Sequence, residues 1–231
     1  MFYLVILVRR WQPLMAYLDH LHAMASRSVM GGPNEYDAYG VITEAFIYHK
    51  NPYDRFTIFP QLYLRWKPTD PSDRRGSIPD FVLGRYIDTW PWVQLQGGAE
   101  VKRAMKKMEG LPHADTIALD DELQKILQVT RGQARDQAVS AIKELRMPNR
   151  KLKWLLFVGP YFAEIELGPF SDAELQTRKH KPNPSGDVVE LIIAKLEKQA
   201  SPVYLPLYRL GTVEAATKLE DYITETKSLL D

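Results

Sequence analysis

The sequence contains no cysteine in its 231 residues. Disulfide bonds, cysteine-ligated zinc and thiol nucleophiles are therefore excluded, although many intracellular proteins also lack cysteine, so the compartment stays open. Histidine is scarce as well. His20 and His22 stand two positions apart on a predicted helix and diverge, and the others are scattered, which argues against a histidine metal centre. A serine nucleophile elbow and a glycine-rich phosphate loop are also missing.

A large net charge is absent too. The chain has 30 Lys and Arg against 29 Asp and Glu, which gives a formal net charge of +1. This balance argues against a polycation that coats nucleic acid, but it is compatible with a local basic groove beside an acidic cluster. Basic residues do gather along the chain, at Arg65 and Lys67, at Arg74 and Arg75, and over 102–107, 146–153 and 178–181.

Long hydrophobic runs are missing. The opening MFYLVILVRRWQP has eight uncharged residues before Arg9, too few to cross a bilayer, and it lacks the basic start of a secretory signal. We therefore expect a soluble intracellular protein with no membrane partner, in either nucleus or cytoplasm. The apolar content of 45% is ample for a core, and no repeat is visible, so we predict one domain over 1–231.

Hydrophobic periodicity predicts helices on both sides of a strand-rich region. Apolar residues three and four positions apart predict a helix over 1–27, interrupted at Pro13. A second helix is expected over 36–49, with a buried side formed by Val41, Ile42, Ala45, Phe46 and Tyr48. Further helices are expected over 102–110, over 113–147 with a break at Thr130–Gly132, and over 187–199 and 212–230.

Aromatic and β-branched residues predict strands between these helices. Three are expected in succession over 55–66, 78–87 and 91–102, and their short connections favour an antiparallel meander. Pro60 indicates an edge strand or a bulge. Two more strands are expected around a turn at Gly159-Pro160, the first of them so uniformly apolar from Trp154 to Val158 that both of its faces should be covered. A basic loop is expected over 177–187.

The strand expected near residue 95 alternates in a way that raises a functional question. Val93, Leu95, Gly97, Ala99 and Val101 are apolar or small, whereas the residues between and after them are Gln94, Gln96, Gly98, Glu100 and Lys102. Because side chains alternate along a strand, Glu100 and Lys102 should share one face. That face is either solvent-exposed or the floor of a site. Gly97 and Gly98 mark either a bulge or a close approach of another backbone.

Pro79-Asp80, followed twenty positions after Asp80 by Glu100-Val101-Lys102, resembles the motif of the PD-(D/E)xK phosphodiesterase superfamily. The resemblance covers about residues 35–167 and includes the order of helices and strands. It implies a restriction-endonuclease-like fold of the α/β or α+β class, with a central mixed β-sheet flanked by helices. The N-terminal helix 1–27 and the C-terminal helices 187–230 would then be additions to this core.

The resemblance also implies a metal site and a reaction. Asp80, Glu100 and the main-chain carbonyl of Val101 would hold Mg²⁺ or Mn²⁺, with Glu44 as a further acidic ligand from the preceding helix. A hard cation prefers such oxygens and activates a water for attack on a phosphodiester. Lys102 would orient or deprotonate that water, or pair with the phosphate.

Further polar residues follow on the helix after this strand. Gln133 and Gln137 are four positions apart and share a helix face, and the resemblance implies that a glutamine here reaches the metal site or the nucleic-acid backbone. Arg135 and Arg131, together with Arg103 and Lys106 just after the strand, are candidates for phosphate contacts. The implied partner is DNA or RNA, bound through its backbone, and a homodimer is compatible with cleavage of both strands.

Other interpretations of the same residues remain open. Glu100 and Lys102 could form a weak surface ion pair, Asp80 could serve a turn, Glu44 could face solvent, and the two glutamines could be ordinary helix surface. The chain would then be a catalytically inactive nuclease-like module that binds nucleic acid or a protein partner in an effector or regulatory role. A third possibility is a structural domain that self-associates through its C-terminal helices.

Overall fold

The computed structural model describes residues 14–24, 36–49, 56–62, 64–65, 76–88, 93–102, 116–145, 150–176 and 204–228. The helices predicted over 102–110 and 187–199 and the loop predicted over 177–187 lie mainly or wholly outside these ranges. Of the predicted helix 1–27, the described part is helical over 14–24. None of the helices in the described ranges has the length and apolar character needed to cross a membrane.

A mixed six-stranded sheet forms the centre of the fold, in the order β1-β4-β5-β6-β7-β8. Its strands are β1 (Phe56–Pro60), β4 (Phe81–Tyr86), β5 (Val93–Lys102), β6 (Leu152–Val158), β7 (Tyr161–Leu167) and β8 (Tyr208–Arg209). Only β5 and β6 pair in parallel, and every other neighbouring pair is antiparallel. The α/β class, the mixed sheet and the antiparallel meander of its first three strands are thereby confirmed.

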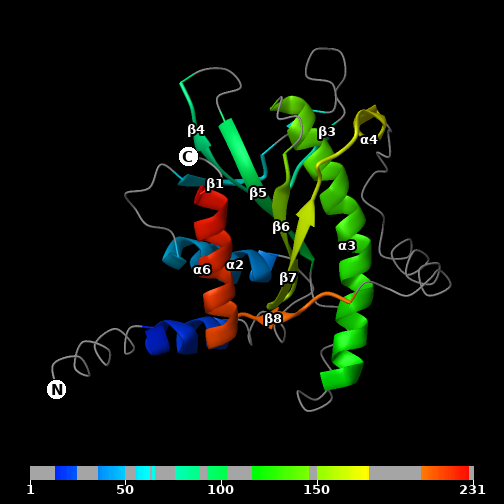
Figure 1. The fold of residues 1–231 in the computed structure, drawn as a ribbon. Helices are drawn as coiled ribbons and strands as arrows, with labels where there is room; N and C mark the ends of the chain where they lie inside the picture. The colour runs from blue at the N-terminus through cyan, green and yellow to red at the C-terminus, as the bar shows by residue number, and fades with distance from the viewer. Residues whose placement is uncertain are drawn as a thin grey trace.

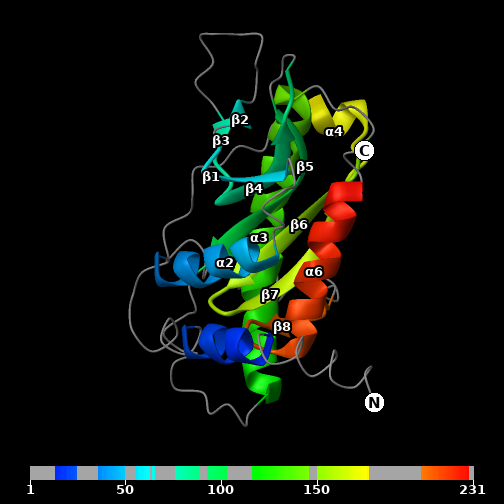
Figure 2. The same cartoon turned by 90° about the vertical axis from the view of Figure 1, so that its left-hand side faces the viewer.

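Helices cover both faces of this sheet (Figures 1 and 2). The long helix α3 (Thr116–Glu144) packs on one face. On the other face lie α2 (Tyr36–His49), α6 (Val213–Ser228) and the helix over 14–24. The prediction of helix 36–49 is confirmed, except that Tyr48 is 45% exposed rather than buried. Tyr48 instead stacks on Tyr17 of the helix over 14–24.

The central strand β6 has apolar side chains on both faces because both faces are covered. Trp154 and Leu156 pack in the core that includes α3, whereas Leu155 and Phe157 pack in the core that includes α2 and α6. The prediction of a doubly covered strand is thus confirmed. Gly159 at a φ of 55° makes the predicted turn into β7.

The segment predicted as one strand over 55–66 is divided in two. β1 ends at Pro60, and Gln61 adopts a left-handed conformation with a φ of 49°. The chain then leaves the main sheet, and β2 (Leu64–Arg65) pairs with β3 (Gly76–Ser77) in a separate small sheet. Pro60 lies on an edge strand, as predicted, because a proline has no N–H to donate to a second neighbour.

A β-bulge changes which side chains of β5 share a face. Leu83 pairs with Gly97 and Gly84 with Leu95, so Gln96 is an extra residue in β5. Val93 and Leu95 consequently pack on the α3 side, whereas Ala99 and Val101 pack on the α2 side. The prediction that all four share one face was wrong, because a single inserted residue reverses the alternation. The bulge suggested by the two glycines is confirmed.

The two glycines also permit close packing on both sides of β5. A Cβ on Gly98 would lie 2.5 Å from the indole ring of Trp154, and a Cβ on Gly97 would lie 2.5 Å from the hydroxyl of Tyr222. Both distances are far below van der Waals contact. Any larger residue here would therefore push the neighbouring side chains away from the strand that carries Glu100.

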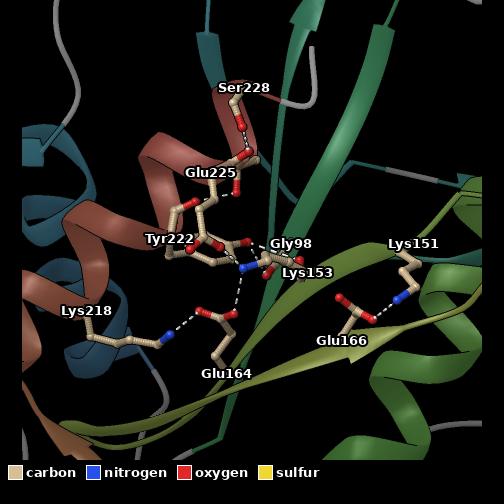
Figure 3. A network of polar contacts seen from close by, with 10 residues as sticks. Gly98, Lys151, Lys153, Glu164, Glu166, Lys218, Tyr222, Glu225 and Ser228 are labelled. Carbon is tan, nitrogen blue, oxygen red and sulfur yellow. Dashed lines mark hydrogen bonds and ion pairs between the residues drawn. The ribbon is translucent and has the colours of Figure 1, made fainter. Parts of the chain in front are cut away.

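Polar contacts hold α6 against the sheet beside these glycines (Figure 3). The Tyr222 hydroxyl lies 3.1 Å from the carbonyl oxygen of Gly98 and 3.2 Å from that of Lys153. The Lys153 ammonium pairs with Glu225 of α6 and with Glu164 of β7. The C-terminal helix predicted over 212–230 therefore forms part of the core and fixes the backbone two residues before Glu100.

Helix α3 runs without interruption through the predicted break at Thr130–Gly132. Thr130 directs its hydroxyl back to the carbonyl oxygen of Ile126, which keeps it compatible with the helix. Gly132 costs a helix only about 1 kcal/mol relative to alanine. Burial before and after it, by Leu127 and Ala134 among others, outweighs that cost and explains why the prediction was wrong.

Candidate functional site

Glu100 and Lys102 lie on one face at the end of β5, and that face is buried against α3. Their ion pair joins Lys102 Nζ to Glu100 Oε1 at 2.6 Å, and the Glu100 side chain is 2% exposed. A solvated strand face is therefore excluded for Glu100. A weak surface pair does not describe this contact either, because one of its two charges is removed from water.

Two glutamines of α3 bind the same carboxylate. Gln137 Nε2 donates to Glu100 Oε2 at 2.5 Å, and Gln133 Nε2 donates to Glu100 Oε1. Their spacing of four residues places both amides on one side of the helix, which is why a single carboxylate can accept from both. Gln137 is 2% exposed, so it is not ordinary helix surface.

Asp80 lies in a bend immediately before β4, not within a strand as predicted. Its Oδ2 accepts the main-chain N–H of Val101 at 2.6 Å, and its Oδ1 accepts the phenol hydroxyl of Tyr39 from α2. The carboxylate of Asp80 is thus tied to the residue that follows Glu100. It lies beside the end of β5 that carries the other two charged groups.

The reason for this arrangement is Pro79. Phe81 pairs with Ala99, so extending the antiparallel register by two residues would place Pro79 opposite Val101. A proline has no N–H for the carbonyl of Val101, and the ladder cannot continue in the usual way. Asp80 Oδ2 accepts the Val101 N–H instead. Since the N–H and C=O of a strand residue point to the same neighbouring strand, the Val101 carbonyl also points toward the segment before β4, where Pro79 has no N–H to donate to it.

Burial makes both carboxylates weaker acids than usual. Desolvation, helped by the nearby charge of Asp80, raises the pKa of Glu100 to about 7 against the opposing effects of Lys102 and Gln137. Desolvation also raises the pKa of Asp80, while Tyr39, Val101 and Lys102 oppose the shift. The three charged groups therefore act on one another, as side chains of a single site do.

The residues present fit a hard divalent cation. An ionised carboxylate offers about four acceptor positions. Two protein donors bind Asp80 and three bind Glu100, so both keep capacity for a further partner. The Val101 carbonyl would add a third oxygen, on the side of β5 that faces the segment before β4. In the part of the chain that the structure describes, no three His, Cys, Asp or Glu side chains come together in a way that could hold a metal. A cation bound by Asp80 and Glu100 would therefore take its other ligands from the main chain and from water.

The remaining predicted site residues do not join this cluster. Glu44 is exposed on α2, where its charge acts on Tyr17, and its five-residue separation from Tyr39 places it on a different side of the helix. Arg135 pairs with Glu174 at 3.1 Å and lies over the ring of Phe170. It therefore faces α4 (Asp172–Gln176).

The structure shows no contact between the other predicted phosphate-binding residues and this cluster, and it does not describe two of them. Arg131 is exposed on α3, two residues before Gln133, so its side chain points to a different side of the helix from that glutamine. Arg103 and Lys106 lie outside the described residues. Their contacts with phosphate stay predictions that rest on charge alone.

Two residues of the site carry a role that the sequence did not indicate. The sequence does not distinguish Tyr39, because a tyrosine within an amphipathic helix is ordinarily part of the core. In the sequence Pro79 is simply the first residue of the Pro-Asp pair, and its effect on Val101 follows only from the strand register. The sequence shows only that Pro79 precedes Val101 by twenty-two positions, and this spacing does not reveal that the two residues lie opposite each other.

No protein-family model, curated protein or solved structure matches this chain. Function therefore has to be argued from the chemistry of the site.

Proposed function

We propose that this chain is a metal-dependent nuclease of the PD-(D/E)xK kind, which hydrolyses phosphodiester bonds of DNA or RNA. The proposal is supported by a single observation above all others: Asp80, Glu100 and Lys102, chosen from a sequence motif, interact electrostatically with one another at the end of β5. The order of a helix, three main-sheet strands, a helix and a parallel strand agrees with a restriction-endonuclease-like core.

Each side chain has a distinct role in this reaction. Asp80, Glu100 and the Val101 carbonyl supply hard oxygen ligands, and Mg²⁺ or Mn²⁺ bound to them would polarise the phosphate and lower the pKa of an attacking water. Lys102 Nζ is positioned by Glu100 and is partly exposed, so it can donate to a phosphate oxygen or orient the water. Gln133 and Gln137 hold the Glu100 carboxylate in place.

The local basic residues support nucleic acid as the substrate. Lys102 is followed in the sequence by three further basic residues, Arg103, Lys106 and Lys107. A cationic surface near an acidic metal centre favours a polyanion with scissile phosphodiesters. Because backbone contacts dominate such binding, affinity should fall with increasing salt concentration.

Cleavage assays with four labelled substrates test the proposal: single-stranded and double-stranded DNA and RNA, each with Mg²⁺, Mn²⁺ or a chelator. We expect hydrolysis that requires the cation and that falls at least about 100-fold in Asp80→Asn, Glu100→Gln and Lys102→Met. Glu122→Gln and Lys125→Met, an ion pair elsewhere on α3, serve as matched controls and should retain activity. Cleavage that persists in all three site variants would remove the mechanism.

A catalytically inactive nuclease-like module is the second candidate. It is favoured by the three protein donors on Glu100, which satisfy much of this carboxylate without a metal. A titration with Mn²⁺ separates the two functions. An active site of the proposed kind raises the melting temperature with increasing Mn²⁺, since a ligand that binds only the folded state stabilises it. An inactive module that has lost the metal site shows no such rise.

A further inference from the structure

Helix α2 contributes a side chain to the proposed site, and that side chain is Tyr39 rather than Glu44. The Tyr39 hydroxyl donates to Oδ1 of Asp80 across 41 positions of sequence, while the Val101 N–H donates to Oδ2 at 2.6 Å. Each oxygen of the carboxylate is therefore held by one donor. The two donors come from different elements, and together they fix the plane of the carboxylate.

The phenol is held firmly in place. Its ring packs against Phe81, the residue next to Asp80, with ring centroids 5.6 Å apart. Ala38, Val41 and Ile42, which flank Tyr39 on α2, are at most 5% exposed and anchor the helix to the sheet. A donor on a rigid, packed helix keeps its geometry when a ligand binds, which is what a supporting hydrogen bond to a metal ligand requires.

We infer that Tyr39 is a positioning residue for Asp80, which it orients and keeps ready to bind a divalent cation. This inference rests on the proposed function, because it assigns Tyr39 a part in the same metal site. Tyr39 touches neither phosphate nor water in this role. It acts through Asp80: loss of its hydroxyl leaves one carboxylate oxygen without a donor and lets the side chain rotate about its bond to Cβ.

Calorimetric titration of the whole, metal-free chain with Mn²⁺ tests the inference. We expect Tyr39→Phe to raise the dissociation constant for Mn²⁺ roughly 10- to 100-fold, the loss that follows removal of an outer partner of a metal ligand. Tyr48→Phe is the matched control, because it makes the same change on the same helix at an exposed position. Its dissociation constant should equal that of the wild type.

A second control separates positioning from general loosening of α2. Ile42→Val removes one methyl group from a fully buried side chain and should lower the melting temperature without changing the affinity for Mn²⁺. If Ile42→Val weakens Mn²⁺ binding as much as Tyr39→Phe does, the effect is structural and the inference is overturned. Equal affinities of Tyr39→Phe and Tyr48→Phe overturn it as well.

The same titration distinguishes failure of the inference from failure of the proposed function. Wild-type protein that binds Mn²⁺ but cleaves no nucleic acid contradicts the nuclease alone, and the comparison of Tyr39→Phe with Tyr48→Phe still decides the role of Tyr39. Wild-type protein that binds no Mn²⁺ contradicts both.

A measurement that keeps the hydroxyl covers the case in which Tyr39→Phe does not fold. 3-Fluorotyrosine is incorporated in place of Tyr39, and its ¹⁹F resonance is followed as Mn²⁺ is added. We expect the line to broaden because the paramagnetic ion lies beside Asp80, and excess Mg²⁺ to sharpen it again. A line that stays sharp while Mn²⁺ binds places the cation elsewhere and overturns the inference.

Discussion

The main-chain N–H of Val101 donates a 2.6 Å hydrogen bond to Asp80 Oδ2 in the place where the strand register would otherwise pair Val101 with Pro79. This bond joins the start of β4 to the end of β5. A proline before the aspartate suits this arrangement, because Pro79 has no N–H and cannot donate a hydrogen bond to the carbonyl oxygen of Val101. The two acidic residues and a main-chain oxygen are thereby brought to the same end of β5, where Asp80 is bound by α2 on one face of the sheet and Glu100 by α3 on the other.

Restoring an N–H at position 79 should weaken the site. In Pro79→Ala the new N–H can donate to the Val101 carbonyl and compete with a cation, so we expect the dissociation constant for Mn²⁺ to rise about tenfold. Pro60→Ala, at the exposed end of the edge strand β1, is the control. Calorimetry should show a loss of affinity for Mn²⁺ in Pro79→Ala and none in Pro60→Ala. Equal affinities of the two variants would show that the Val101 carbonyl is not a ligand.

The burial of Glu100 predicts how stability depends on pH. Its pKa is raised to about 7 from 4.5, so the folded protein binds the proton more tightly than the unfolded chain does. The stabilisation from this group is fully present below pH about 4.5 and is lost as pH rises through about 7, by at most about 3 kcal/mol.

Glu100→Gln isolates this effect, because glutamine has a similar size and does not ionise. Without metal, the unfolding free energy of the wild type should fall relative to that of Glu100→Gln between pH about 4.5 and 7, and Mn²⁺ should reverse the fall near pH 7. Urea unfolding at several pH values measures the difference in unfolding free energy between the two proteins. A difference between the two proteins that stays constant with pH would mean that Glu100 is not buried as described.

Gln137 should tune the acidity of Glu100. Its donated hydrogen bond lowers the pKa of that carboxyl group, so Gln137→Met should raise this pKa and shift the acid limb of the Mn²⁺-binding profile to higher pH. Near pH 6.5 the affinity should drop about tenfold. Gln128→Met is the same change elsewhere on α3 and should leave the profile in place. Superimposable profiles for the two variants would exclude this role.

Two glycine-to-alanine changes should alter stability in opposite directions. Gly98→Ala forces a Cβ to within 2.5 Å of the Trp154 ring and should cost roughly 1–3 kcal/mol of unfolding free energy. Gly132→Ala adds a Cβ that meets no atom within 4 Å beyond its chain neighbours and the backbone of its own helix, and it should stabilise the protein by about 0.5–1 kcal/mol. Denaturant midpoints measure both, and a stable Gly98→Ala protein would show that Trp154 does not pack against β5.

Much of the sheet could be predicted because its signals are local. The alternation around Glu100 identified β5 and placed Lys102 on the same face, and the four-residue spacing of Gln133 and Gln137 placed both on one side of α3. The bulge at Gln96 was indicated by two glycines, but the reversal of faces that it causes depends on the partner strand β4.

The role of Tyr39 could not be predicted in this way. Its partner Asp80 is 41 positions away, and no period or spacing connects a residue of α2 with a bend before β4. Glu44 was chosen instead because its charge suited a metal ligand, whereas the helix geometry turns Glu44 toward Tyr17. Similarly, Gly132 signalled a helix break, and only the continuous burial of α3 against the sheet shows why none occurs.

The position of the cation is the most direct test of the proposed site. Crystals of the whole chain soaked in Mn²⁺ should give an anomalous difference peak about 2.0–2.3 Å from a carboxylate oxygen of Asp80, one of Glu100 and the Val101 carbonyl oxygen. A strong peak elsewhere, or none at a concentration that stabilises the protein in solution, would contradict the metal site and with it the proposed hydrolysis.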